Sequence, residues 1–254
     1  MWNWIAKLTE LHASQQPFAI VTVTRCSGST PRETGAKMLV RSNGELFGTI
    51  GGGQLEHQVR SDALLCIREG VTKTIHYPLY ASVHQCCGGV VEVLVEVLNQ
   101  NPAFYLFGAG HVGQALCRTL AGTPFQVHLI DERTEWVHSP ELPADVVRHQ
   151  KSWDAFAREA RWDKQHTYVA IMTHEHELDL EILRGLLSRP TRYLGMIGSA
   201  TKWKSFQEKL LAAGAPQAQL DRVKCPIGLA LGGKSPQEVA ISIAAELLTV
   251  HHGK

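Results

Sequence analysis

Three glycines between a predicted strand and a predicted helix constrain the fold of this chain more than any other feature. Residues 104–107 form an apolar run typical of a buried strand, and Gly108, Gly110 and Gly113 follow it before a helical pattern over 112–120. In this spacing the first glycine allows a tight turn, the second lets the backbone approach a diphosphate, and the third lets the helix pack on the strand. The unpaired N–H groups at the helix N-terminus favour an anion.

The residues after this helix complete a dinucleotide-binding pattern. A second predicted strand, 126–130, ends in Asp131, 18 residues beyond Gly113, where an acid is placed to hold a ribose hydroxyl. His111 occupies a position where many dehydrogenases have a smaller or apolar residue facing the diphosphate. The pattern therefore predicts a nucleotide site of which His111 is a part, and leaves the ligand open between NAD(P) and another nucleotide.

The rest of the second half alternates predicted strands with predicted helices. The strands are 146–148, 167–172 and 193–197, and the helices are 153–160, 178–187, 202–213 and 236–250. Such alternation predicts an α/β fold, a Rossmann-like doubly wound parallel sheet. Because ligands bind at the carboxyl ends of strands in these sheets, Asp131, His174 and Ser199 are further candidate binding residues. Ser199 is also placed to cap the helix that follows it.

A second interpretation of one strand end is a metal site. His174 and His176 stand two residues apart, with Asp179 close behind them. They converge only if the backbone stays extended, and no third ligand is evident in the sequence. Helix capping and solvent exposure explain the same residues equally well.

The first half predicts a smaller α+β domain. A helix is expected at 2–14 and another after residue 53, and strands at 19–24, 37–41, 46–50, 71–76 and 90–98. The polar, proline-containing stretch 99–102 is the expected domain boundary, so that the domains are 1–99 and 103–254.

A loop of the first domain is rich in residues that can bind an anion. It runs from 25 to 35 and contains Arg25, Ser29, Thr30 and Arg32. Arginine forms bidentate contacts with phosphate, and hydroxyls add donors. The alternative is a solvated loop whose arginines face water.

Two glycine motifs follow in the same half. Gly51, Gly52 and Gly53 stand between a strand and a helix, which suits either a flexible turn or the close approach of a ligand. Glu56, in the first turn of that helix, would repel an anion placed beside it.

The second glycine motif contains two adjacent cysteines, Cys86 and Cys87, followed by Gly88 and Gly89. An accessible thiol on such a loop can contact a soft metal or take part in sulfur chemistry. Equally, both cysteines can be small buried apolar residues.

Composition excludes several classes of protein. The formal net charge is +1, so no strong overall field attracts nucleic acid or a membrane surface. No run of 18 apolar residues occurs, and Lys7 and Glu10 interrupt the region where a signal peptide has its apolar core. The six cysteines lack a regular spacing, which is typical of a reducing compartment. We therefore expect a cytoplasmic protein, for which a homodimer is compatible with the size.

The order of the motifs resembles the XdhC/CoxI family over nearly the whole chain. In the first half the likeness is carried by 28–32, 35–38, 48–53 and 87–89, and in the second half by 107–113, Asp131-x-Arg133, 173–174, 196–202, 226–229 and 236–246. The cysteine that precedes two glycines in the family pattern corresponds to Cys87.

The resemblance implies a molybdenum cofactor chaperone and not an enzyme. Such a protein binds molybdopterin or its cytidine dinucleotide form, allows a cysteine desulfurase to install the terminal sulfido ligand, and transfers the cofactor to an apo molybdenum hydroxylase of the xanthine dehydrogenase type. Arg25, Arg32 and Lys37 would supply positive charge, and Cys87 would be a soft contact to molybdenum or its sulfur. Glycine turns at helix N-termini suit the phosphates.

Two other functions are compatible with the residues. The glycine pattern and Asp131 alone favour an NAD(P)-dependent oxidoreductase, but only His111, His174 and Asp179 are candidates for acid–base catalysis near strand ends. That function also gives the motifs of the first half no role. A nucleotide-sensing regulator is the third interpretation.

Overall fold

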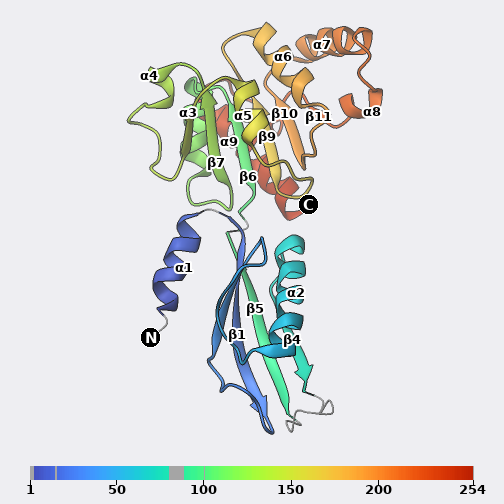
Figure 1. Ribbon diagram of the computed structural model, residues 1–254. Coiled ribbons are helices and arrows are strands. Elements are labelled where there is room, and N and C mark those ends of the chain that lie inside the picture. Colours follow the sequence, from blue (N-terminus) through green and yellow to red (C-terminus); the bar gives the residue numbers. More distant parts are fainter. Residues whose placement is uncertain (1–2, 15, 80–88, 100, 254) are drawn as a thin grey trace. The chain divides into compact units, whose positions relative to one another are not determined.

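The computed structural model describes residues 3–14, 16–79, 89–99 and 101–253. The chain divides into two compact units, 1–100 and 101–254, which are described separately (Figure 1). None of the helices in the described ranges is long and apolar enough to cross a membrane.

The first unit is an antiparallel sheet with a helix on each face. Its strands are β1 (Phe18–Ser27), β2 (Lys37–Arg41), β3 (Leu46–Gly48), β4 (Lys73–Pro78) and β5 (Val90–Leu98), in the order β3-β2-β1-β5-β4. Helix α2 (Gly53–Glu69) covers the face formed by Val21, Met38 and Val93, which alternate with residues of the opposite face as the period of a strand requires. Helix α1 (Trp4–Ala13) covers the opposite face through Leu11 (Figure 1).

The second unit is a six-stranded parallel sheet, as the alternating pattern predicts. The strands are β6 (Ala103–Phe107), β7 (Gln126–Asp131), β8 (Val147–Gln150), β9 (Thr167–Ile171), β10 (Tyr193–Met196) and β11 (Val223–Lys224), in the order β11-β10-β9-β6-β7-β8. Each neighbouring pair is parallel. The strand order reverses between β6 and β9, and this is where open α/β sheets bind ligands.

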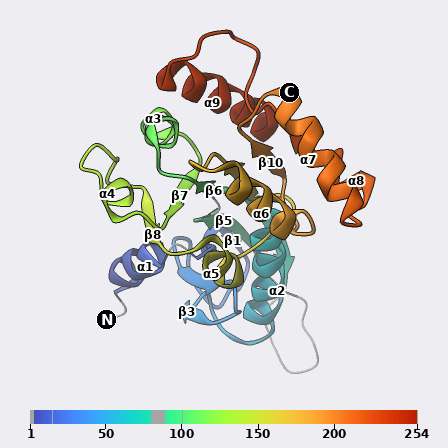
Figure 2. The same cartoon turned by 90° about the horizontal axis from the view of Figure 1, so that it is seen from above.

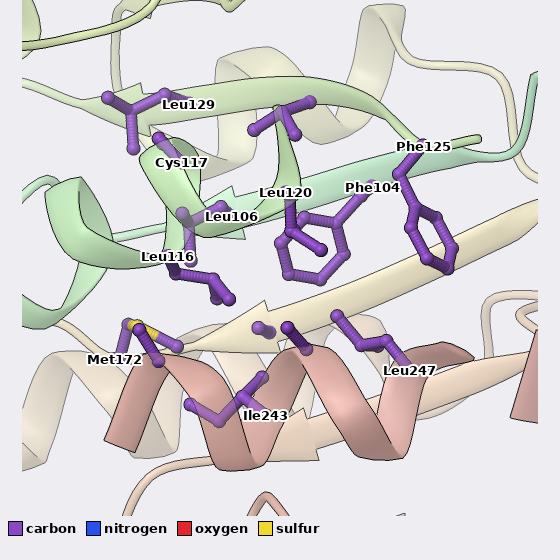
Figure 3. Close-up of a cluster of buried hydrophobic side chains, with 14 of the residues drawn as sticks. Phe104, Leu106, Leu116, Cys117, Leu120, Phe125, Leu129, Met172, Ile243 and Leu247 are labelled. Carbon is purple, nitrogen blue, oxygen red and sulfur yellow. The ribbon is translucent and has the colours of Figure 1, made fainter. Parts of the chain in front are cut away.

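Helices cover both faces of this sheet, so the predicted Rossmann-type fold is confirmed. They are α3 (His111–Leu120), α4 (Thr134–Val137), α5 (Trp153–Glu159), α6 (His176–Leu186), α7 (Ala200–Ala212), α8 (Gln217–Leu220) and α9 (Pro236–His252). On one face α3 and α9 lie side by side (Figure 2) and bury Leu116 and Ile243 against Leu106 (Figure 3). On the other face α5, α6 and α7 cover Phe107 and Val169.

Several boundaries differ from those predicted. Strand β1 extends to Ser27 because the loop arginine Arg25 and its neighbours still pair with β5, beyond a register shift. Strand β3 ends at Gly48, two residues earlier than expected. The short elements α4, α8 and β11 have too few residues for a recognisable period, so the sequence did not reveal them.

Candidate functional site

The glycine turn between β6 and α3 contains two glycines that the fold itself requires. Gly108 has a φ of +113°, and a Cβ there would overlap the carbonyl oxygen of Met172, the residue that follows the neighbouring strand β9. A Cβ on Gly113 would overlap the carbonyl oxygen of Gly108. Both glycines therefore let backbone segments pack against each other, as predicted for the turn and the helix.

Gly110 differs from its two neighbours in the motif. Its φ of −65° suits any residue, and a Cβ built there meets nothing within 4 Å. Gly110 is also the N-cap of α3, where the unpaired N–H groups of the helix point outward. The fold places no demand for glycine at this position, so the open space above Gly110 fits a ligand that approaches the backbone closely.

Asp131 lies at the end of β7, beside this turn, and its carboxylate is hydrogen-bonded to other groups of the protein. Its oxygens accept hydrogen bonds from the Ala109 N–H at 2.8 Å and the Arg133 N–H at 3.0 Å, and from Arg133 Nε at 2.9 Å and Nη2 at 2.7 Å. These donors outweigh the effect of burial and hold the pKa of Asp131 below its usual value. The acid joins the glycine turn to the loop after β7.

Arg133, Trp136 and His111 form a continuous surface at the start of α3. The Arg133 guanidinium lies 5.1 Å from the centre of the Trp136 ring, and the exposed His111 ring meets the same indole edge-on at 5.0 Å. The sequence placed His111 at this site, and the structure adds Trp136 and the side chain of Arg133.

A buried ion pair lies at the carboxyl ends of β9 and β10. Lys202 Nζ donates to Asp179 at 2.7 Å, and Asp179 also accepts from the N–H and hydroxyl of Thr173. Ser199 caps α7 by accepting from the Lys202 N–H, as predicted. These contacts attach α6 and α7 to the strand ends. Asp179 is therefore a structural partner of Lys202, with its carboxylate buried.

The two histidines of the alternative metal site are exposed. His174 Nε2 lies 3.1 Å from the Glu175 carboxylate, and Asp179 is bound to Lys202. Within the part of the chain that the structure describes, no three His, Cys, Asp or Glu side chains are grouped so that they could hold a metal ion.

In the first unit, three of the sequence motifs meet at one end of the sheet. A Cβ on Gly51 would lie 2.5 Å from Pro31, and one on Gly89 would lie 2.6 Å from the carbonyl oxygens of Ser27 and Ser29. The segment between Ser27 and Pro31 therefore packs directly on Gly51 and Gly89. Its conformation is further held by Thr30, whose hydroxyl donates to the Arg32 carbonyl oxygen at 3.1 Å.

The triple-glycine turn already holds a carboxylate. Glu56 accepts hydrogen bonds from the N–H groups of Ile50 at 3.0 Å and Gly52 at 2.8 Å, and from the Thr49 hydroxyl. These bonds lower the pKa of Glu56 although its burial opposes the shift. Gly51, Gly52 and Gly53 all have positive φ, so the turn needs glycine for its own shape. Glu56 therefore occupies two backbone donors of this turn, those of Ile50 and Gly52.

The cationic residues of this unit lie in different surroundings. Arg25 and Arg32 are exposed, Arg25 at the end of β1 and Arg32 in the following loop. Lys37 is half-buried, with its Nζ donating to Thr22 at 2.8 Å and lying 5.5 Å from the Trp4 ring. The predicted residues Cys87 and Gly88, and Cys86 beside them, lie outside the described residues.

Sequence reasoning overlooked two side chains that shape these sites. Arg133 entered only as part of a motif, although its position two residues after Asp131 is the signal for a local ion pair. For Glu56 the sequence indicated only repulsion of an anion, and the structure adds that its carboxylate accepts hydrogen bonds of the triple-glycine turn.

The chain has relatives over nearly its full length. Residues 104–247 match the XdhC Rossmann domain, and residues 11–78 match the XdhC and CoxI family. Uncharacterized protein YqeB of Escherichia coli is 33% identical over 98% of this chain and 46% of its own length. A probable xanthine dehydrogenase subunit of Bacillus subtilis is 26% identical over 74% of this chain and 52% of its length. The chain thus spans about half of each of these two proteins.

Two further relatives cover most of both chains. The molybdenum cofactor insertion chaperone PaoD of Escherichia coli is 23% identical over 91% of this chain and 82% of its own length. A crystal structure described as a xanthine dehydrogenase from Bacillus halodurans has a TM-score of 0.53 at 22% identity, and covers 98% of this chain and 96% of that one. This last likeness supports the fold.

Proposed function

Since the chain belongs to the XdhC and CoxI family, we propose that it is a chaperone of the molybdenum cofactor and not an enzyme. It binds molybdopterin or its cytidine dinucleotide form, holds it while a cysteine desulfurase supplies sulfur, and delivers it to an apo molybdenum hydroxylase. The name of the relative PaoD, a molybdenum cofactor insertion chaperone, supports the cofactor as the cargo. The name of the Bacillus subtilis relative supports a hydroxylase of the xanthine dehydrogenase type as the recipient.

The observation that carries this proposal is the meeting of the motifs in the first unit. The end of β1, which carries the exposed Arg25, and the loop after it, which carries the exposed Arg32, pack on Gly89 and Gly51. Guanidinium groups beside hydroxyls form a donor set suited to the phosphate of molybdopterin. Because the Glu56 carboxylate accepts hydrogen bonds from the triple-glycine turn, we assign binding of the phosphate to the arginines. In this proposal the glycines only support the segment that carries the arginines.

A soft contact to molybdenum or its sulfur remains our proposal for Cys87. A thiol suits the metal because soft sulfur ligands bind soft metal centres. Its replacement by alanine should reduce transfer of the cofactor more than it reduces phosphate-dependent binding.

Binding of purified molybdopterin tests the arginines directly. The variant Arg25→Ala/Arg32→Ala should bind the pterin at least about tenfold more weakly, because charge-assisted hydrogen bonds contribute about 1.5–3 kcal/mol each. Arg68→Ala is the matched control, because Arg68 is also exposed but lies in the last turn of α2. Retention of the pterin after gel filtration would be measured by its fluorescence. Equal retention by the double variant and the control would contradict the assignment.

We further propose that the second unit binds a nucleotide diphosphate at the N-terminus of α3. The open space above Gly110 supports this, because none of the described residues lies within 4 Å of a Cβ at this position and packing therefore does not require glycine there. An NAD(P)-dependent oxidoreductase is the second candidate function on the same observation. Against it, the buried acid and base at the strand ends, Asp179 and Lys202, are bound to each other. If the protein is a chaperone and not an oxidoreductase, the nucleotide serves as a bound ligand or signal that is not consumed in a reaction.

A further inference from the structure

The end of β7 decides which ribose the nucleotide site accepts. In a βαβ unit whose first helix holds the diphosphate, the ribose lies beside the last residue of the second strand, which is Asp131 in this chain. The side chains around Asp131 therefore identify the class of nucleotide that suits the site.

The carboxylate of Asp131 is not open to a ribose hydroxyl. Its side chain is 7% exposed, whereas that of Arg133 is 25% exposed. The four hydrogen bonds from Ala109 and Arg133 match the number of acceptor positions that a carboxylate offers, which is about four. A free 2′-hydroxyl could bond to Asp131 only by displacing one of these donors.

The Arg133 guanidinium has donors to spare. Nε and one N–H of Nη2 point to Asp131, and the described residues provide no hydrogen-bond partner for Nη1. The guanidinium is held in place from two sides, by the carboxylate and by the Trp136 ring. Such a fixed, planar group with free N–H donors is well suited to bind phosphate oxygens.

A second donor and the helix favour negative charge in the same place. The exposed His111 ring also contacts Trp136, and His111 begins α3, whose N-terminus carries a partial positive charge. Asp131 and Arg133 neutralise each other, and the carboxylates of Glu135 and Glu175 also act on the Arg133 guanidinium. What favours an anion here is therefore the positive end of the helix together with the N–H donors of Arg133 that Asp131 leaves free.

We propose that the nucleotide site of the second unit selects a ribose that carries a 2′-phosphate, as in NADP, and that Arg133 binds this phosphate. This selectivity rests on the nucleotide binding proposed above for the N-terminus of α3. The free 2′-hydroxyl of NAD meets an Asp131 carboxylate whose acceptor positions are already taken. Arg133 is thus a specificity-determining residue, with Asp131 as the group that orients it.

Binding of NADP⁺ and NAD⁺ to the full chain, measured by calorimetry, tests this selection because the two ligands differ only in the 2′-phosphate. We expect about 10- to 100-fold tighter binding of NADP⁺, as for other hydrogen bonds to charged groups. In Arg133→Leu this preference should disappear or reverse, because the Asp131 carboxylate regains two acceptor positions for a hydroxyl. Arg118→Leu is the matched control, since Arg118 pairs with Glu141 near the other end of α3.

The outcomes separate the two levels of the proposal. If the unmutated protein binds NAD⁺ as tightly as NADP⁺, the 2′-phosphate inference is wrong but the nucleotide site stands. If Arg133→Leu, shown to be folded by circular dichroism, keeps the preference for NADP⁺, Arg133 is not the residue responsible. If neither nucleotide binds, both the site and its selectivity are refuted. The comparison in the unmutated protein needs no variant to fold.

Discussion

Replacing Gly110 with alanine separates the binding role of the glycine turn from its folding role. The substitution adds a methyl group where a Cβ meets nothing within 4 Å, on a backbone whose φ of −65° alanine adopts readily. The matched substitution, Gly113→Ala, places the same methyl group against the carbonyl oxygen of Gly108. The two variants differ from the native chain by the same atoms.

The structure gives different magnitudes for their stability. For Gly110→Ala, the loss of a glycine N-cap lowers the unfolding free energy by a few tenths of a kcal/mol or somewhat more. Alanine also lowers the conformational entropy of the unfolded chain, which raises the unfolding free energy by about 0.4–1 kcal/mol. The net change is therefore about zero. For Gly113→Ala, overpacking costs up to about 3 kcal/mol and helix propensity returns about 1 kcal/mol. A net loss of about 2 kcal/mol follows, because the new Cβ is fixed to its Cα and the carbonyl oxygen of Gly108 belongs to the backbone, so neither can rotate away.

Urea denaturation with and without NADP⁺ measures both effects. Four of the six tryptophans report on the second unit: Trp136, Trp153, Trp162 and Trp203. At a ligand concentration about 100 times the dissociation constant of the native chain, binding should raise its unfolding free energy by about 2.7 kcal/mol. Gly110→Ala should lose at least about 1.4 kcal/mol of this gain, a tenfold weaker affinity. If Gly110→Ala binds like the native chain, or unfolds as easily as Gly113→Ala, the division of roles is wrong.

Two further predictions concern the core of the second unit. Burial and the stacked His149 lower the pKa of His128 to about 4, so between pH 6.5 and 4 the unfolded chain binds a proton that the folded chain does not. Lowering the pH from 7 to 4.5 should therefore cost about 2 kcal/mol of stability through His128, and a His128→Phe variant with an equally steep pH profile would contradict this. Tyr168→Phe should raise the unfolding free energy by about 1 kcal/mol, because its buried hydroxyl has no partner among the described residues. Tyr193→Phe should lower the unfolding free energy by about 1 kcal/mol or more, because the Tyr193 hydroxyl donates to Glu246. If urea denaturation shows that the two tyrosine variants change the unfolding free energy in the same direction, this reasoning is wrong.

Much of the second unit could be predicted because its signals are local. The capping box of α9 can be read from Ser235 and Glu238 alone, and the structure shows both of its hydrogen bonds. The parallel direction of neighbouring strands follows from the alternation of strands and helices, because each connection returns to the same end of the sheet before the next strand begins. The Ser199 cap of α7 is equally local.

The contents of the candidate sites could not be predicted in the same way. The sequence places Gly51, Gly52 and Gly53 at a helix N-terminus, but the side chain of Glu56 turns back and takes the donors of the turn. Asp179 stands near two histidines in sequence, yet it pairs with Lys202, 23 residues away. Which partner a charged group chooses depends on distances between segments that local patterns do not contain.

The glycine turn after β6 shows where the two sources of information divide. The sequence by itself determined that a strand, a tight turn and a helix follow one another there, because glycine spacing and hydrophobic period are properties of the chain. Only the tertiary structure decided that Gly108 and Gly113 serve backbone packing while Gly110 stays open, and that the Ala109 N–H of the turn donates to Asp131. These outcomes depend on which atoms of distant segments come within a few ångströms of the turn.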